Sequence, residues 1–266
     1  MNRQELVKEI KSKKSFLCIG LDTDITKIPK HLFDFEDPVF EFNRAIIDST
    51  NDLCVSYKIN TAFYEAQGVK GWQSMEKTLN YIPKEIFSIA DAKRGDIGNT
   101  STQYAIAFLQ NMNFDSITVA PYMGSDSVKP FLAFENKWAI VLGLTSNVGA
   151  FDFQYFESKG EKLFEKVIKE VSQWGTHENL MFVIGATKAE QLKAIREIIP
   201  NHFLLIPGVG TQGGSLEDVC KNGMNNEIGI LVNVSRQIIY AGNGHDFANC
   251  AREEAMKLQM EMATYI

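Results

Sequence analysis

Eight short apolar segments recur along the chain, and they restrict the folds that it can adopt. Most are apolar nearly throughout, as expected of strands that are covered on both faces of a parallel sheet. Helical patterns lie between them, and no linker rich in proline, glycine or serine divides the chain. The predicted strands span residues 16–21, 53–59, 86–90, 116–120, 139–144, 181–184, 203–206 and 228–234.

Eight strand–helix units without a break predict an α/β fold, a single (β/α)8 TIM barrel domain over residues 1–266. The clearest helices are expected over 161–174, from Thr187, where Glu190 completes a capping box, and from Phe247 onwards. An open doubly wound sheet is the alternative, since periodicity alone does not distinguish the two. Polar residues gather where the predicted strands end. This favours the barrel, because its strand ends converge on one mouth, where such enzymes carry their active sites.

Composition argues against several classes of partner. The net charge of −6 and the pI near 5.4 disfavour nucleic acid and membrane surfaces, which require a basic face. The first residues carry no apolar signal-peptide core, and the four cysteines lie far apart, so we expect a cytoplasmic protein with reduced thiols. The four histidines are equally scattered, and no metal site is predicted.

The segment IADAKRGDIGNTS (residues 89–101) places charges of both signs at the end of a predicted buried strand. Asp91 and Lys93 are two residues apart, so both side chains are expected on one face of an extended strand. Lys58 ends another predicted strand, and Asp96 follows in the same loop. A lysine held protonated between carboxylates is suited to act as a general acid. The alternative is an ion-pair network without chemistry, which is costly to bury.

A glycine-rich turn, PGVGTQGGS, begins at Pro207 and contains G-x-G-x-x-G at Gly208, Gly210 and Gly213. A dinucleotide fold carries this motif in its first strand–helix unit, whereas here it follows the seventh predicted strand. We therefore interpret the turn as a phosphate site at the start of a helix near residue 215. Arg236, at the end of the eighth strand, can bind the same phosphate. The alternative is a tight turn and an unrelated surface arginine.

The segment GLTSNVGA (residues 143–150) places hydroxyl and amide groups after the fifth predicted strand. Ser146 can hydrogen-bond a polar ring edge. No histidine lies nearby in the sequence, so a hydrolytic nucleophile is not predicted.

Together these segments resemble the orotidine 5′-phosphate decarboxylase family, in particular its longer bacterial subgroup. The resemblance rests on LDTD (21–24), YKINTAFYEAQG (57–68), DAKRGDIGNTS (91–101), LTSNVGA (144–150), PGVGTQGG (207–214) and VNVSRQIIYAG (232–242), in the family's order. These motifs span nearly the whole chain. Val148 departs from the proline that related sequences often have, but this removes no chemical group.

The resemblance implies a homodimer that converts orotidine 5′-phosphate to UMP and CO2 without a cofactor, the last step of de novo UMP biosynthesis. It implies that Lys93 protonates C6, that Asp91 lies against the departing carboxylate, and that Lys58 braces Asp91 and the ribose. Asp96 and Thr100 are then expected to reach the active site of the other subunit.

The resemblance also implies a set of substrate-binding residues. Asp22 is expected to hold a ribose hydroxyl, and Ser146 the pyrimidine edge. Gln212, Gly213 and Arg236 are expected to hold the phosphate, and Pro207 and Gly208 complete the set.

Two rival functions are compatible with a barrel of this kind. A metal-dependent sugar-phosphate decarboxylase or aldolase needs a set of carboxylate ligands for magnesium. Lys58 occupies a position where such an enzyme would need one of these ligands. A silent phosphate-binding sensor has no need of the whole charged set. Orotidine 5′-phosphate decarboxylation is therefore the predicted function.

Overall fold

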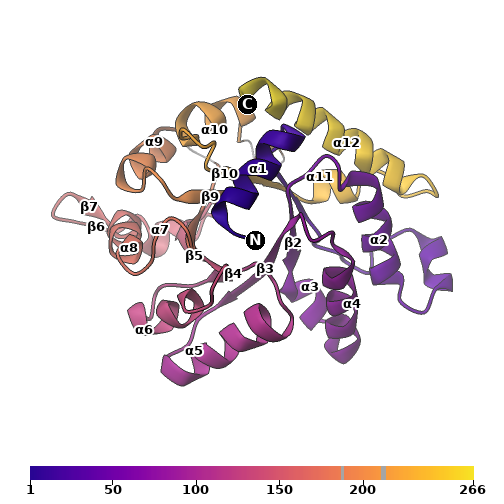
Figure 1. Cartoon of the computed structure of the whole chain (residues 1–266), viewed down its shortest axis with the longest axis horizontal. Coiled ribbons are helices and arrows are strands. Elements are labelled where there is room, and N and C mark those ends of the chain that lie inside the picture. The colour runs from indigo at the N-terminus through magenta and orange to yellow at the C-terminus, as the bar shows by residue number, and fades with distance from the viewer. Residues whose placement is uncertain (187–188, 211–213) are drawn as a thin grey trace. The chain divides into compact units, whose positions relative to one another are not determined.

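The computed structural model describes the chain except for residues 187–188 and 211–213 (Figure 1). In the described part, eight strands form a closed parallel barrel in the order β1-β10-β9-β8-β5-β4-β3-β2. The predicted TIM barrel is thus confirmed, and the open-sheet alternative is wrong. The barrel strands are β1 (Leu17–Gly20), β2 (Ser56–Asn60), β3 (Phe87–Arg94), β4 (Ser116–Val119), β5 (Trp138–Leu144), β8 (Leu180–Ile184), β9 (Phe203–Pro207) and β10 (Ile230–Val234).

Helices alternate with these strands, and the final predicted helix is confirmed as α12. The helix expected over 161–174 begins only at Leu163, because Glu157–Ser158 (β6) and Glu161–Lys162 (β7) pair as a hairpin. The expected capping box at Thr187 lies outside the described residues. The α-helices are α1 (Arg3–Lys13), α2 (Pro38–Thr50), α3 (Thr61–Glu65), α4 (Gly68–Tyr81), α5 (Gly98–Ala105), α6 (Ser125–Val128), α7 (Ala150–Phe153), α8 (Leu163–Ser172), α9 (Ala189–Ile198), α10 (Leu216–Gly223), α11 (Arg236–Ile239) and α12 (Phe247–Met262).

Shorter helical elements complete the described chain: 3-10 turns η1 (Lys30–Asp34), η3 (Lys129–Leu132) and η4 (Ala263–Tyr265), and a π-helical segment η2 (Ile106–Asn111). None of the helices in the described residues is long and apolar enough to cross a membrane.

Contacts divide the chain into two compact units. Unit 1 comprises Met1–Arg3 and Lys93–Val232, and unit 2 comprises Gln4–Ala92 and Asn233–Ile266.

Unit 2 contains β1, β2 and most of β3 in parallel register, with Cys18 opposite Ser56 and Asn60 opposite Asp91. Figure 1 shows α12 beside α2 and α11 in this unit. The Phe42 ring of α2 stacks on the Phe247 ring of α12 with centroids 5.1 Å apart. This aromatic contact joins helices that are about two hundred residues apart in sequence.

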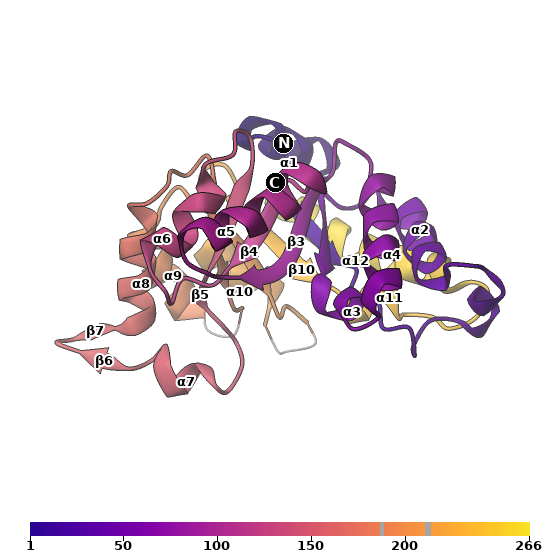
Figure 2. The ribbon, with the colours of Figure 1, turned by 90° about the horizontal axis from the view of Figure 1, so that it is seen from below.

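Unit 1 pairs β4, β5, β8 and β9 in succession. The register between β5 and β8 shifts around Gly143, where an added Cβ would lie 2.8 Å from Ile184 and 3.2 Å from Ile168 of α8. A glycine here therefore lets α8 approach the sheet closely. In Figure 2 the β6–β7 hairpin and α7 extend away from the amino end of α8.

Two arginines hold the loops at the amino ends of the unit 1 strands. Arg3 donates to the Glu227 carboxylate at 2.7 Å and to the carbonyls of His177 and Asn201. Arg196 donates to several carbonyls, including those of Gly223 and His202. Burial, together with the nearby charge of Arg3, lowers the pKa of Arg196 to about 10. Since a guanidinium offers five donors in a fixed plane, each arginine can satisfy several loop carbonyls at once.

Candidate active site

The site in unit 2 is built on a buried lysine near the carboxyl end of β2. Lys58 Nζ lies 3.0 Å from Asp91 Oδ2 on β3 and 3.2 Å from Asp22 Oδ1, two residues beyond β1. Its side chain is 6% exposed. Burial acts to lower the pKa of Lys58, but the charges of Asp22 and Asp91 more than offset this, so its pKa is raised and it stays protonated. The structure brings together three of the predicted site residues.

Ser235, which precedes α11, fixes the other oxygen of Asp22. Ser235 Oγ lies 2.7 Å from Asp22 Oδ2 and 3.0 Å from the carbonyl oxygen of Gly20, and its single hydrogen can be donated to either. A Cβ at Gly20 would lie 2.7 Å from the Cβ of Ser235, so only glycine leaves room for this contact. When Ser235 donates to Asp22, both oxygens of that carboxylate are held, one by Lys58 and one by Ser235.

Tyr240 holds the backbone of the same segment. Its hydroxyl donates to the Asp22 carbonyl at 3.1 Å and accepts the Asp24 N–H at 2.7 Å. Burial raises the pKa of Tyr240 to about 12, so the phenol remains a donor at neutral pH. The segment is thus held at its side chain and at its backbone.

A buried polar chain supports the next residue, Thr23. Thr23 Oγ1 donates to Asn43 Oδ1 at 2.5 Å, and Asn43 Nδ2 donates to the Tyr64 hydroxyl at 2.9 Å. Tyr64 in turn donates to the Leu21 carbonyl at 3.1 Å. A satisfied buried network of this kind favours one conformation of residues 21–23.

Sequence reasoning missed the roles of Ser235, Tyr240 and the Thr23 network. Position 235 offered one signal, since it is a polar residue at the end of a strand. The partners of Tyr240 lie more than 200 residues away, and no local pattern indicates them.

Lys93 belongs to unit 1, and the strand that carries it is longer than predicted. The predicted strand ends at residue 90, but β3 continues to Arg94, whose carbonyl accepts the Ala120 N–H at 2.8 Å. Within this extension Lys93 has φ of 46°, in the left-handed region. The simple alternation of an extended strand, on which the shared face of Asp91 and Lys93 was predicted, therefore does not apply at this residue, and the shared face stays a prediction. Such a conformation is strained for a lysine and is typical of functional positions.

The surroundings of Lys93 hold its backbone in place. Its N–H donates to Thr118 Oγ1 at 2.8 Å, and its side chain is exposed. The next residue, Arg94, packs over the rings of Tyr104 and Phe108 at 5.5 and 5.3 Å. Arg94 is therefore a packing residue, although it stands in the charged run.

Asp96 and Thr100 follow β3. Asp96 is half-buried and its carboxylate accepts the N–H of Ile97 at 2.8 Å. Thr100 is exposed in the first turn of α5. Ile97, between them, is 58% exposed.

Ser146 lies in the loop after β5 and is half-buried. Thr145, before it, accepts a hydrogen bond from Gln154 Nε2, and Val148, after it, is 87% exposed. The loop that is predicted to bind the base therefore lies at the surface, and Gln154 holds it at Thr145.

The predicted phosphate turn follows β9. Pro207 ends that strand, and Gly208 and Gly210 have φ of 96° and 80°, which suit glycine. Ser215 caps α10, its Oγ accepting the Asp218 N–H, so the helix predicted near residue 215 is confirmed. Gln212 and Gly213 lie outside the described residues. In unit 2, Arg236 opens α11 directly after Ser235 and is exposed.

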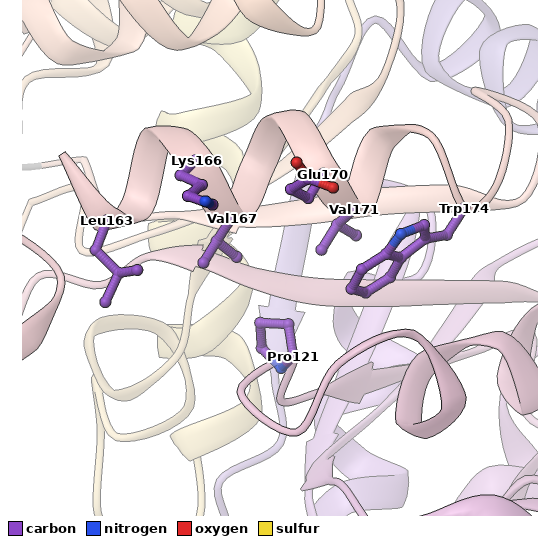
Figure 3. Close-up of a pocket in the computed structure, with 7 residues that line it drawn as sticks. All are labelled: Pro121, Leu163, Lys166, Val167, Glu170, Val171 and Trp174. Atoms are coloured by element: carbon purple, nitrogen blue, oxygen red, sulfur yellow. The ribbon is translucent and has the colours of Figure 1, made fainter. Parts of the chain in front are cut away.

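Away from these residues, a hollow of about 430 Å³ lies along α8 (Figure 3). In that view Val167 and Val171 point from α8 towards the side on which Pro121 lies. No predicted site residue lines it. Among the described side chains, no group of three or more His, Cys, Asp or Glu residues is placed to hold a metal ion.

The fold and the charge network define a class: a (β/α)8 barrel with an enzyme-type site at the carboxyl ends of its strands. A sequence model of the orotidine 5′-phosphate decarboxylase / HUMPS family matches residues 15–248, and the chain belongs to that family.

Individual relatives match along the whole chain. The orotidine 5′-phosphate decarboxylase of Flavobacterium johnsoniae is 61% identical over 269 residues, covering 100% of this chain and 98% of the relative. That of Phocaeicola vulgatus is 58% identical over 266 residues, covering 98% of each. Among solved structures, the OMP decarboxylase of Leishmania donovani has a TM-score of 0.82 and 32% identity, covering 98% of this chain and 99% of that one.

Proposed function

We propose that the chain decarboxylates orotidine 5′-phosphate to UMP and CO2. Relatives carrying that name share more than half of its residues over the full length. The structural observation that carries the proposal is Lys58 held between Asp22 and Asp91, with Lys93 two positions beyond Asp91.

The reaction demands stabilisation of a carbanion. The bond from C6 to the carboxylate breaks, its electron pair stays on C6, and CO2 departs. The ring cannot delocalise this pair as an enolate, so fixed charge must provide stabilisation towards the upper part of the roughly 8–23 kcal/mol that enzymes supply. We assign Lys93 to favour the carbanion and to transfer its Nζ proton to C6, after which it regains a proton from water.

The buried network has a complementary role. Asp91 lies against the substrate carboxylate, and its repulsion is relieved as neutral CO2 leaves. Lys58 holds Asp91 in place at 3.0 Å and offsets its charge. Asp22, fixed through both oxygens, presents its remaining lone pairs to a ribose hydroxyl.

The remaining predicted residues bind the ends of the substrate. We assign Ser146 to the pyrimidine edge. The phosphate is assigned to Arg236 and to the turn formed by Pro207, Gly208, Gln212 and Gly213. Backbone N–H groups of a glycine-rich turn and a guanidinium are both suited to a phosphate.

We propose that residues 1–266 act as one catalytic domain and that two copies form a homodimer, in which Asp96 and Thr100 serve the partner's site. Both residues follow the end of β3, beside the exposed Ile97. The reaction is placed in the cytoplasm, where free cysteines such as those of this chain stay reduced.

Mixed dimers test the shared site. Lys93→Ala and Asp96→Ala homodimers are each expected to be nearly inactive. After random remixing of equal amounts, half the dimers are mixed and each has one intact site, so about a quarter of wild-type activity should return. No recovery despite demonstrated exchange would assign Asp96 to its own subunit.

A substrate comparison tests the reaction itself. The purified chain is incubated with orotidine 5′-phosphate, and loss of ring absorbance is followed with and without a chelator. We expect turnover that the chelator leaves unchanged. Failure to turn over this substrate, with magnesium-dependent activity on a sugar phosphate instead, would favour the rival function.

A further inference from the structure

The loop that carries Ser146 is held by a glutamine that follows α7. The N–H of Thr145 donates to Gln154 Oε1 at 2.8 Å, and Gln154 Nε2 donates to Thr145 Oγ1, also at 2.8 Å. Thr145 Oγ1 then donates to Asn147 Oδ1 at 2.6 Å. The residues on both sides of Ser146 are therefore tied, directly or through Thr145, to one half-buried amide.

Gln154 is itself firmly placed. Its N–H donates to the Ala150 carbonyl at 2.8 Å, and its carbonyl accepts the N–H of Phe164 at 3.0 Å, in the first turn of α8. Phe164 and Ile168 of α8 are buried in unit 1. The amide thus links the Ser146 loop to a helix packed against the barrel strands.

A glycine also lies close to Ser146. Gly185 follows β8 directly, and its N–H donates to the Leu144 carbonyl at 2.8 Å. A Cβ at this position would lie 2.9 Å from both the N and the Cβ of Ser146. Ser146 therefore packs closely against the backbone of Gly185, and the residue before it is held by Gln154.

We infer that Gln154 is a positioning residue for recognition of the pyrimidine base, acting through Thr145 on Ser146. This rests on the proposed function, in which Ser146 contacts the base. Its two hydrogen bonds fix the place at which the loop leaves β5, so their loss moves a base contact without touching the phosphate or ribose contacts. Misplacement of a binding group by about 1 Å can cost on the order of 10²-fold in rate.

The test compares a ligand that has a base with one that lacks it. UMP and ribose 5-phosphate are titrated calorimetrically into wild type and Gln154→Leu, a substitution of similar size without the amide. We expect UMP affinity to fall roughly 10-fold, with a similar or larger loss of kcat/KM for orotidine 5′-phosphate, while ribose 5-phosphate affinity is unchanged. Equal weakening of both ligands, or unchanged UMP affinity, would overturn the inference.

A matched control separates the amide's specific role from general loosening of the segment. Gln191 Oε1 accepts a hydrogen bond from the Tyr155 hydroxyl at 3.0 Å, and Tyr155 is the neighbour of Gln154. Gln191→Leu, in α9, removes an amide that contacts the same segment but leaves Thr145 held. We expect its UMP affinity to match wild type; the same loss as in Gln154→Leu would refute the positioning role.

Two milder variants keep the inference testable if Gln154→Leu does not fold. Gln154→Glu keeps an acceptor for the Thr145 N–H and should retain most UMP affinity. Thr145→Val removes only the hydroxyl contacts and should give a smaller, base-specific loss. If either weakens ribose 5-phosphate as much as UMP, the inference fails. Absence of wild-type turnover would instead refute the proposed function, whatever these affinities show.

Discussion

Replacing Lys58 by methionine removes the positive charge that contacts both Asp22 and Asp91 while keeping much of the side-chain volume. Lys77 provides a matched control, because its Nζ lies 3.0 Å from Asp37, the same separation as from Lys58 to Asp91. The side chain of Lys58 is 6% exposed and that of Lys77 is 51% exposed. The two substitutions therefore differ chiefly in burial and in the number of carboxylates left behind.

The structure gives the size of the expected effect. At an effective dielectric constant of about 20, each contact of Lys58, at 3.0 and 3.2 Å, contributes about 5 kcal/mol of attraction before the cost of desolvation. Breaking a buried pair from one side typically costs about 3–5 kcal/mol, since an uncompensated charge remains buried. An exposed pair such as that of Lys77 is screened by solvent and contributes far less.

Equilibrium urea unfolding and thermal unfolding of the three proteins measure this difference. For a chain of this size, we expect Lys58→Met to lower Tm by roughly 10 °C and Lys77→Met by about 3 °C at most. Salt should weaken the Lys77 effect more than the Lys58 effect, because exposed charges are screened. If the two variants are equally stable, Lys58 does not hold a buried network and the reasoning is wrong.

Three further outcomes are expected. Gly20→Ala should displace Ser235, since the added Cβ would lie 2.7 Å from the Cβ of Ser235. We expect kcat/KM for orotidine 5′-phosphate to fall by about tenfold, with a smaller change in Tm, and unchanged kinetics would contradict the role of Ser235. Arg236→Ala should lower kcat/KM by roughly 10²-fold for the phosphorylated substrate but barely affect a substrate without phosphate, and an equal loss on both would make Arg236 structural. Burial, with the charges of His177, Arg196 and Arg3, lowers the pKa of His202 from 6.5 to about 4. The stability that the neutral imidazole contributes is therefore complete above pH 6.5 and is lost as the pH falls towards 4. His202→Phe should flatten this part of the curve of Tm against pH, and an unchanged slope would argue against a buried neutral histidine.

The barrel could be predicted because its strands are buried on both faces and so are apolar nearly throughout. Lys58 and Asp91 could also be predicted as neighbours, because both were expected at the carboxyl ends of successive strands. The register agrees, since Asn60 lies opposite Asp91. These features depend on local composition and on the geometry of a parallel sheet.

Other features depend on contacts that no local pattern encodes. Ser235 contacts Asp22, which lies 213 residues away in the sequence. Nothing in the sequence around a serine indicates which distant group its hydroxyl will contact. The positive φ of Lys93 follows from its surroundings and not from its residue type, because lysine itself disfavours that conformation. The hairpin at 157–162 was missed because its polar two-residue strands have no apolar alternation.

The central claim is that Lys93 supplies the chemistry and does not merely bind substrate. Single-turnover decarboxylation and UMP affinity should be measured for wild type, Lys93→Ala and Lys159→Ala, an exposed lysine whose φ of 54° is close to the 46° of Lys93. The account predicts a rate constant at least about 10³-fold lower for Lys93→Ala, UMP affinity within about tenfold of wild type, and no effect at Lys159. A Lys93→Ala enzyme that still decarboxylates near the wild-type rate, or one whose loss is entirely in ligand affinity, would contradict it.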